Sequence, residues 1–274
     1  MTLDVLYNMK REMLRRKLSP RTVKTYLHFV RQFLLANRDK HPKEFSKRDV
    51  REFLYKLEER DVSGSTLNVA HNALRFMMID VLHKACYLKI RYAKTPKRQP
   101  GYLTREEARR LLDAISNPKH KLLASLMYGA GLRVREATML KHKDFDFEEG
   151  VGWVRGGKGD KDRPFIIPES LKDELREACN DQQSWLFPGR KGPLSTKTAQ
   201  AVVERAGKAA GISKKVHPHM LRHSFTTHLL EAGLDVTTVQ SLLGHARPET
   251  TLGYSHAAKP RLITVKSPLD PPTD

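Results

Sequence analysis

Cysteine, long apolar runs and clustered carboxylates are what this 274-residue sequence lacks. Only Cys86 and Cys179 occur, far apart, which favours two reduced structural thiols over the disulfide framework of a small secreted protein. No stretch approaches the ~20 consecutive apolar residues that a membrane span requires. Basic residues from Arg11 to Lys17 interrupt the pattern of a signal peptide early. We therefore expect a cytoplasmic chain with no membrane partner.

The missing carboxylates also limit the chemistry. A two-metal nuclease needs Asp and Glu at metal-binding spacing, and no such cluster is present. His219 and His223 stand four apart, but no H-E-x-x-H pattern and no nearby acidic or Cys ligand completes the set that zinc requires. The glycine-rich stretch 156–161 lacks the spacing of a nucleotide-binding P-loop. The sequence thus predicts no metal and no cofactor.

Positive charge is what the sequence has in excess. Lys and Arg number 50 against 31 Asp and Glu, for a formal charge of +19 and a pI near 10. Residues 1–100 hold 23 of the basic and 10 of the acidic residues, so most of the excess lies there. A field of this sign attracts polyanions, and nucleic acid is the partner we expect. Charge alone leaves open a basic protein that has no such partner.

Helical periodicity dominates the first 90 residues. Ser19 offers a capping hydroxyl and Pro20 suits the first helical position, and apolar residues follow at helical spacing. We predict a four-helix domain over 1–90, with the apolar stripes as its core. The other helices are expected over 3–17 and after Ser46 and Ser65.

A basic segment at 91–102 breaks the helical pattern. Pro96, Pro100 and Gly101 indicate an exposed, extended linker between two domains. Such a linker could also lie along a phosphate backbone. The candidate DNA-binding residues in it are Arg91, Lys94, Lys97 and Arg98.

The sequence of residues 103–274 predicts a mixed α+β domain. The chain as a whole is therefore expected to be mainly α. Thr104 and Glu107 have the spacing of a capping box that opens new helices. Alternation and glycine turns over 145–167 then indicate a small three-stranded antiparallel sheet. The last residues, 267–274, contain three prolines and are expected to form an extended or mobile tail. Helices are expected between sheet and tail at about 169–179, 196–210, 218–232, 236–243 and 248–255.

Six polar side chains in this second part stand where packing gives little reason for them. Each alone has an ordinary explanation, such as a surface ion pair from Arg133 to Glu136, a solvated hairpin lysine or a half-buried tyrosine. Together, two arginines, a lysine and two histidines could neutralise a phosphodiester and move protons, and a tyrosine could attack it. With no metal carboxylates, they predict metal-free attack on DNA phosphate. The six are Arg133, Lys158, His219, Arg222, His245 and Tyr254.

These residues resemble those of the tyrosine site-specific recombinases, the phage integrase family. The N-terminal stretches S-P-R-T-V-K-T-Y and V-S-G-S-T-L-N are similar to the SAM-like core-binding domain of Xer-type recombinases and integron integrases. Only 60 residues separate Lys158 from His219, which leaves little room for the helical insertion of integron integrases, so a compact Xer-like or mobile-element enzyme fits better. The matching motifs are G-A-G-L-R-V-R-E at 129–136, G-G-K-G-D-K-D-R at 156–163, H-x-x-R-H at 219–223, L-L-G-H at 242–245 and Y-S-H at 254–256.

The resemblance implies a role for each matched residue. Tyr254 would attack the scissile phosphate to give a 3′-phosphotyrosyl link, while Lys158 protonates the leaving 5′-oxygen. His219 would act as general acid and base toward the tyrosine, and His245 would hydrogen-bond a phosphate oxygen. The remaining roles are the phosphate clamp, Arg133 and Arg222, and support of Arg133 by Glu136.

The resemblance also implies partners. Four copies of the chain would join two DNA duplexes and exchange strands through a Holliday junction, with no high-energy cofactor. The segment after Tyr254, with Leu262, Ile263 and Val265, would dock on a neighbouring protomer. Chromosome dimer resolution, integration and excision stay open as tasks, as do an accessory protein, cleavage in cis or in trans, and the target sequence.

Three other classes compete with this interpretation. A DNA-binding regulator with a degenerate recombinase fold is disfavoured because all six positions are filled. A type IB topoisomerase uses similar chemistry, but the Xer-like N-terminal region argues against it. A metal-dependent nuclease would lose its activity in EDTA.

Overall fold

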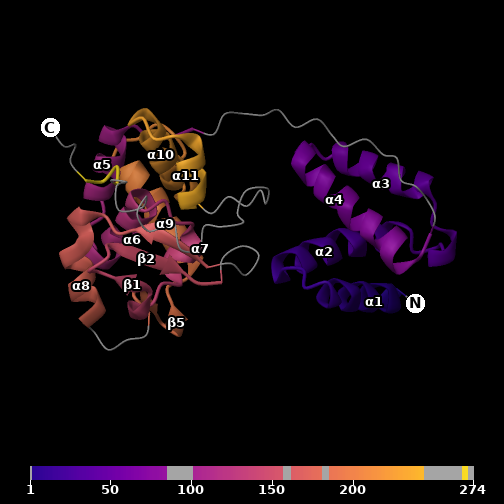
Figure 1. The fold of residues 1–274 in the computed structure, drawn as a ribbon. Helices are drawn as coiled ribbons and strands as arrows, with labels where there is room; N and C mark the ends of the chain where they lie inside the picture. Colours follow the sequence, from indigo (N-terminus) through magenta and orange to yellow (C-terminus); the bar gives the residue numbers. More distant parts are fainter. Residues whose placement is uncertain (1, 85–100, 157–161, 181–184, 244–266, 271–274) are drawn as a thin grey trace. The chain divides into compact units, whose positions relative to one another are not determined.

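The computed structural model describes residues 2–84, 101–156, 162–180, 185–243 and 267–270 (Figure 1). The chain divides into two compact units, Met1–Arg98 and Gln99–Asp274. Both are mainly helical, and the second also holds a small three-stranded antiparallel sheet, so the predicted fold class is confirmed. Within the described ranges, no helix is long and apolar enough to cross a membrane.

The first unit is a helical bundle whose helices begin at side-chain caps. Ser19 Oγ accepts a hydrogen bond from the backbone N–H of Thr22, as the sequence predicts. The predicted helix start after Ser46 is confirmed, and Ser46 and Asp49 form a capping box there. The predicted cap at Ser65 is wrong by two residues, because the hydroxyl of Ser63 accepts the hydrogen bond from the backbone N–H of Thr66 instead. The helices are α1 (Thr2–Arg15), α2 (Pro20–Ala36), α3 (Lys47–Glu58) and α4 (Gly64–Phe76), with a 3₁₀ turn at Pro42–Glu44 and a π-helical turn, η2, at Met77–Val81.

Aromatic and methionine side chains fill the core of this unit, as their helical spacing predicts. The Phe33 ring meets those of Phe45 and Phe53 edge to face, with centroids 5.1 and 5.6 Å apart. Met9 and Met13 of α1 are fully buried in the same cluster. The aromatic and methionine side chains buried in this cluster are therefore structural, whereas Tyr7 and Tyr55 are exposed.

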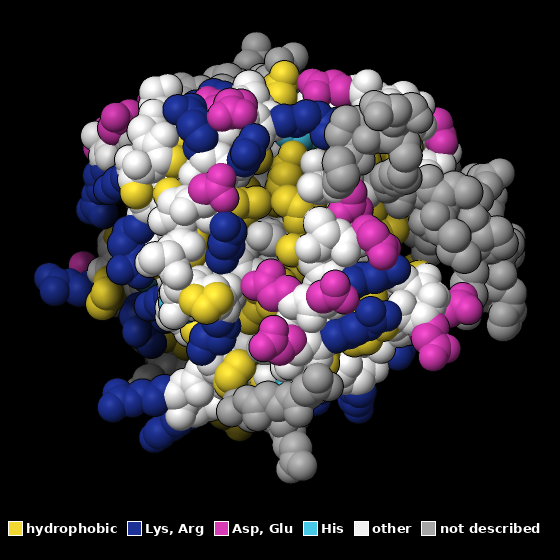
Figure 2. All heavy atoms as spheres, turned by 90° about the vertical axis from the view of Figure 1, so that its left-hand side faces the viewer, with side chains coloured by type: hydrophobic (Ala, Val, Ile, Leu, Met, Phe, Trp, Pro, Cys, Tyr) yellow, Lys and Arg dark blue, Asp and Glu magenta, His cyan; other side chains and the backbone are white. Residues whose placement is uncertain are grey.

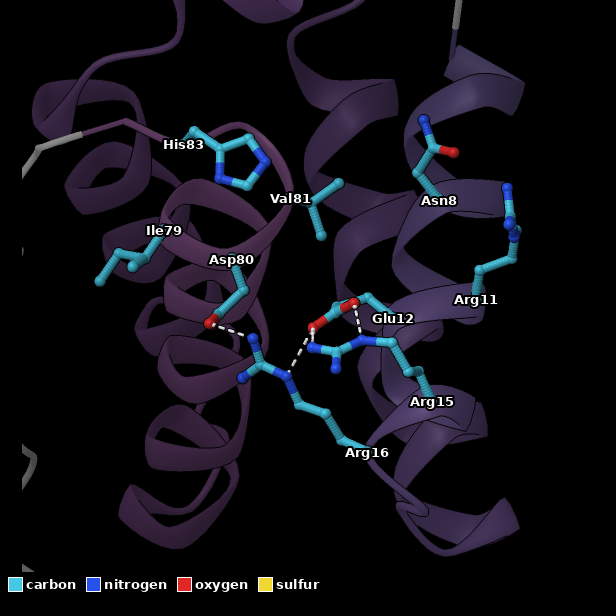
Figure 3. A pocket seen from close by; sticks show the side chains of 9 residues that line it. All are labelled: Asn8, Arg11, Glu12, Arg15, Arg16, Ile79, Asp80, Val81 and His83. Atoms are coloured by element: carbon cyan, nitrogen blue, oxygen red, sulfur yellow. Dashed lines mark hydrogen bonds and ion pairs between the residues drawn. The ribbon is translucent and has the colours of Figure 1, made fainter.

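An open groove runs between α1 and η2 (Figure 3). Arg16 lies in it between two carboxylates, 2.7 Å from Glu12 Oε1 and 2.7 Å from Asp80 Oδ1. Arg15 also binds Glu12, at 2.6 Å. The pKa of Glu12 is lowered to about 2, first by the hydrogen bond from Arg15 and then by that from Arg16. These ion pairs tie the two elements together and neutralise most of the groove's charge, so we regard it as part of the scaffold.

The second unit surrounds α6, a helix buried on every side from Leu122 to Gly129. In the sheet, β2 pairs with both neighbours, and Val154 stands opposite Arg163. The sequence analysis did not predict a further hairpin, which β4 (Pro188–Gly189) and β5 (Gly192–Pro193) form. The other elements are α5 (Arg105–Asp113), α6 (Pro118–Gly129), α7 (Val134–Thr138), β1 (Phe145–Asp146), β2 (Val151–Val154), β3 (Arg163–Ile166), α8 (Lys172–Asn180), α9 (Thr196–Ala209), α10 (Pro218–Glu231) and α11 (Val236–Leu243), with 3₁₀ turns at His142–Asp144 and Glu169–Leu171.

Two surface properties of this unit bear on earlier expectations. On the face shown in Figure 2, basic and acidic side chains are interspersed, in keeping with the 27 basic and 21 acidic residues of 101–274. Cys179 is a free, half-buried thiol, and burial raises its pKa to about 11. Cys86 lies outside the described residues.

The C-terminal segment Ser267–Asp270, here called the C-terminal clasp, packs on the second unit. The predicted extended tail over 267–274 is therefore wrong for these four residues, because each finds a partner. Ser267 Oγ donates to the carbonyl of Gly129, and Leu269 packs against the main core. The Asp270 carboxylate accepts hydrogen bonds of 3.1 and 2.9 Å from the N–H groups of Glu169 and Ser170. A carboxylate at this helix start accepts hydrogen bonds from free N–H groups and interacts favourably with the positive end of the helix dipole.

Removal of the Asp270 cap should weaken the second unit. We expect Asp270→Ala to lower the free energy of unfolding by about 1 kcal/mol, the usual effect of losing a helix cap. In thermal unfolding this corresponds to a loss of roughly 3 °C for a domain of this size. Glu148→Ala, which removes an exposed carboxylate from the same unit, is the matched control. Equal melting temperatures for the two variants would show that the clasp adds no stability.

Candidate active site

Three arginines of the second unit gather around one carboxylate. We call Arg133, Arg163 and Arg222, together with Glu136, the arginine cluster. Arg133 Nη1 lies 2.6 Å from Glu136 Oε1, and Arg163 Nη2 lies 2.6 Å from Glu136 Oε2. Arg222 Nη1 stands 3.7 Å from that same Oε2 atom. Three positive charges therefore share one negative charge, and the cluster carries a net positive charge.

Arg133 owes its position to the glycine turn before it. Gly131 has a φ of +60°, and a Cβ there would stand 2.4 Å from the Phe225 ring, so only glycine fits. The chain then enters α7 with Arg133 at the N-cap, where its N–H donates to Glu136 Oε2 at 2.9 Å. The sequence allowed either a surface ion pair or support by Glu136. The pair exists, but Glu136 is only 9% exposed, so it belongs to the interior.

Arg222 is the most deeply buried member of the cluster, at 2% exposure. Its Nη1 donates to the carbonyl of Gly131 at 2.5 Å, and its Nη2 donates to the carbonyl of Leu243 at 2.7 Å. Arg222 therefore joins the turn before Arg133 to the end of α11. The expected helix over 218–232 is confirmed as α10, with His217 as its cap.

Arg163 was not singled out by the sequence. It is the last residue of the matched stretch 156–163 and the first residue of β3. Its place in a strand gave no indication of its buried partner. It is 8% exposed, and its Nη1 donates to the carbonyl of Leu242 at 2.8 Å. The signal that could have identified it is the position of an arginine at the start of a short strand, just after a glycine-rich stretch of sequence.

The C-terminal end of α11 is thus held by two guanidinium groups. The last carbonyls of a helix have no partner within it and carry partial negative charge. The carbonyl oxygen of Leu242 accepts a hydrogen bond from Arg163, and that of Leu243 accepts one from Arg222. Their side chains pack with Ile166 and Phe225 in a small separate core. Burial and charge together therefore fix where the chain leaves α11.

Burial and like charges shift the pKa values in the cluster. The pKa of Arg222 falls to about 9, mainly because the group is buried and next because Arg133 and Arg163 repel it. Burial acts to raise the pKa of Glu136, but the charge of Arg163 and the hydrogen bonds of Arg133 outweigh it, so the net shift is downward. A pKa of about 9 still leaves Arg222 charged at neutral pH. The repulsion from Arg133 and Arg163, the second cause of this lowering, is the part that a bound anion would relieve.

His219 lies on the first turn of α10 with its side chain at the surface. Its pKa is lowered, first by the partial burial of the ring and then by the charges of Arg222 and His217. The ring is therefore neutral at pH 7 and has a lone pair that can accept a proton. His219 and Arg222 lie three apart on this helix, as the spacing predicts.

The structure brings together Arg133, Glu136 and Arg222, and His219 lies one helical turn from Arg222. The predicted helix at 248–255 and the other predicted residues lie outside the described residues. Within the described part of the chain, no three His, Cys, Asp or Glu side chains gather as a metal site. The predicted residues outside it are Lys158, His245, Tyr254, Arg91, Lys94, Lys97 and Arg98.

Comparison with known proteins identifies the family. Residues 101–261 match the profile described as the phage integrase family, and residues 5–86 match that of the phage integrase N-terminal SAM-like domain. Tyrosine recombinase XerA of Thermococcus onnurineus is 39% identical over 246 residues, covering 86% of this chain and 85% of the relative. An integrase/recombinase of Escherichia coli is 36% identical, covering 92% and 89%. The chain therefore belongs to the phage integrase family, and it is a tyrosine site-specific recombinase.

Solved structures agree with this assignment. XerH site-specific recombinase, bound to its difH substrate in a pre-cleavage complex, is 26% identical, with a TM-score of 0.68 over 90% of this chain and 79% of that one. A lambda integrase dimer bound to a COC′ core site shares the fold alone, at 19% identity and a TM-score of 0.73 over 88% and 94%. The SAM-like N-terminal domain expected from the sequence is thereby confirmed.

Loss of the central carboxylate should destabilise the second unit. Glu136→Gln leaves three guanidinium groups without their counter-charge, and breaking a buried ion pair typically costs about 3–5 kcal/mol. We expect this loss in urea unfolding at pH 7, with Glu106→Gln, an exposed carboxylate of α5, as the matched control. The pKa of Glu136 is lowered in the folded chain, so its stabilisation exists above the ordinary pKa of about 4.3 and disappears as the pH falls through the folded value. The gap to wild type should therefore narrow below about pH 4. A gap independent of pH would contradict this origin.

Proposed function

We propose that this chain cuts and rejoins double-stranded DNA at a specific site, through a covalent bond between Tyr254 and a backbone phosphate. The observation that carries the proposal is the arginine cluster. It holds both arginines of the matched motifs, has excess positive charge, and fixes the carbonyl of Leu243 at 2.7 Å from Arg222. The segment that contains His245 and Tyr254 therefore begins beside two guanidinium groups. Such a cluster suits the extra negative charge of a phosphoryl transition state.

The proposed chemistry balances without a cofactor. The Tyr254 oxygen attacks phosphorus while His219, neutral at pH 7, accepts the phenol proton. The bond from phosphorus to the 5′-oxygen breaks, and Lys158 gives that oxygen a proton. The product is a 3′-phosphotyrosyl link and a free 5′-hydroxyl. Attack by the 5′-hydroxyl of a partner strand reverses each step and releases the tyrosine, so the bond energy is conserved.

The two clamp arginines have different surroundings. Arg133 is one-third exposed, so part of its guanidinium faces solvent, where a phosphate could approach. Arg222 is buried, but a guanidinium has five N–H donors, so it can keep a carbonyl and add a phosphate oxygen. His245 would supply a further donor to the phosphate, and Glu136 would hold Arg133 in place. Phosphate binding would also relieve the repulsion that lowers the pKa of Arg222.

The rest of the chain would bind and position the DNA. We propose a core-binding domain over 1–90, a basic linker over 91–102 and a catalytic domain over 103–274, since the family matches fall at 5–86 and 101–261. The charge excess of residues 1–100 suits contact with phosphates, and the linker cations Arg91, Lys94, Lys97 and Arg98 would add to it. The XerH relative is bound to a DNA substrate, which supports a DNA target for this chain.

Strand exchange would need several copies of the chain. We propose a homotetramer that joins two duplexes, passes through a Holliday junction, and works in the cytoplasm. The COC′ complex of lambda integrase, which shares the fold, contains a dimer, so assembly on DNA is compatible with this architecture. Either dimer resolution or the integration and excision of a mobile element would use the same chemistry.

Tyr254→Phe should abolish the covalent product and leave DNA binding intact, because it removes only the attacking oxygen. The target is first selected from a pool of random duplexes by binding, and a nick is placed beside the cleavage point so that the reaction is trapped. Wild type should give a covalent protein–DNA band in EDTA. Tyr7→Phe, at an exposed tyrosine of α1, is the matched control. Trapping by the Tyr254 variant would assign the nucleophile elsewhere, and loss of the wild-type band in EDTA would point to a metal.

Arg133→Ala should slow cleavage far more than it weakens binding, since the clamp acts on charge that develops in the transition state. We expect a loss of about 10²–10³ in the single-turnover rate, the usual effect of removing one such donor. The affinity for the selected duplex should change by less than about tenfold. Arg135→Ala, two residues along and exposed, should keep the wild-type rate. Equal losses in the two variants would mean that Arg133 contributes only general charge.

A further inference from the structure

Arg163 is a buried arginine that the proposed phosphate chemistry leaves without a role. One of its donors binds Glu136 Oε2 at 2.6 Å, and another binds the carbonyl of Leu242 at 2.8 Å. It is 8% exposed, so little of it can reach a DNA backbone. A single guanidinium therefore links β3, α7 and the end of α11.

Each of these elements adjoins a proposed catalytic residue. β3 follows the glycine-rich stretch of sequence with Lys158, α7 begins just after Arg133, and α11 precedes His245 and Tyr254 in the chain. The links are short and involve two rigid anchors, a carboxylate that itself holds Arg133 and a helix-end carbonyl. A shift of Arg163 would therefore move three parts of the site relative to one another.

The energetics argue against a purely stabilising role. Removing a guanidinium from water is costly, and apolar side chains of similar size often stabilise a core as well or better. Nε of Arg163 has no hydrogen-bond partner among the described residues, which adds to this cost. Burial also lowers the pKa of Arg163 despite the carboxylate of Glu136. What an arginine supplies here is a planar group that fixes two acceptors at one distance and angle.

We propose that Arg163 is a positioning residue for strand cleavage. It acts through Glu136 and the Leu242 carbonyl, sets the spacing of the start of β3, Arg133 and the end of α11, and does not bind phosphate. The proposal rests on the proposed function, in which those three segments carry the chemistry. Lysine keeps the charge but has one ammonium group in place of a fork, so it can hold only one of the two acceptors well.

Arg163→Lys and Arg163→Met test the proposal in single-turnover cleavage of the nicked duplex, with full-length protein well below each variant's melting temperature. Misplaced catalytic groups typically cost about 10–100-fold, so we expect roughly tenfold for lysine and about a hundredfold for methionine. The affinity for DNA should stay within about threefold, because no phosphate contact is lost. Arg155→Lys and Arg155→Met are matched controls, since Arg155 follows β2 and pairs with Asp162 at the surface. Both should cleave at the wild-type rate.

A double-variant cycle with Glu136→Gln shows whether Arg163 acts through that carboxylate. The double variant Arg163→Lys with Glu136→Gln should lose less rate than the product of the two single losses, because both changes break the same link between Arg163 and Glu136. Wild-type cleavage rates for both Arg163 variants would overturn the proposal, and so would losses of affinity that match the losses of rate. If Arg163→Met does not fold, the lysine variant and its cycle still decide. Failure of wild type itself to trap DNA would refute the proposed function instead.

Discussion

Glu136 carries the carboxylate that all three arginines of the cluster approach, and the arrangement of the second unit near the site depends on this contact. Without a shared negative charge, three guanidinium groups within one small region would repel each other and move toward solvent. With it, two of them stay almost fully buried. Other donors of these two guanidinium groups are then directed at the backbone carbonyls of Gly131, Leu242 and Leu243. A single ion-pair network thereby determines the turn before Arg133 and the end of α11.

The network also explains why the site has excess charge rather than neutrality. One glutamate stabilises the arginines enough to fold, but three guanidinium groups share its single negative charge, so the charge balance is incomplete. A second carboxylate would stabilise the chain further but would repel a phosphate. The cluster therefore combines ion pairs that stabilise the folded interior with an excess positive charge that an anion could balance. Stability given up at a binding site in this way is a common feature of enzymes.

Local signals in the sequence predict most of the fold. Capping hydroxyls at Ser19 and Ser46, the capping box at Thr104 and the change of period before Val151 all lie where the structure uses them, because each depends on neighbours within a few positions. The error at Ser65 has the same origin. Ser63 and Ser65 both offer a capping hydroxyl, and local residues do not determine which of the two becomes the N-cap. In the structure the N-cap is Ser63.

The candidate site could be predicted only in part, since its contacts are long-range. Arg133 and Glu136 are three residues apart, so their pairing is visible in the sequence. The partner of Arg163 is 27 residues away and that of Ser267 is 138 away, and no local pattern announces either. Three prolines made 267–274 resemble a free tail, yet a hydroxyl, a leucine and a carboxylate each find a place on the folded surface.

The two fixed ends of the segment that carries the tyrosine have a topological consequence. Leu243 is attached through Arg222, and Ser267 is attached through Gly129, so both ends of residues 244–266 belong to one unit. A chain of that length, sent out and back, reaches at most roughly 40 Å from its attachment points. While both ends hold, a partner subunit could receive only a returning loop and never a free arm. A full swap of this segment between subunits would first require the C-terminal clasp to open, so these four residues restrict its exchange.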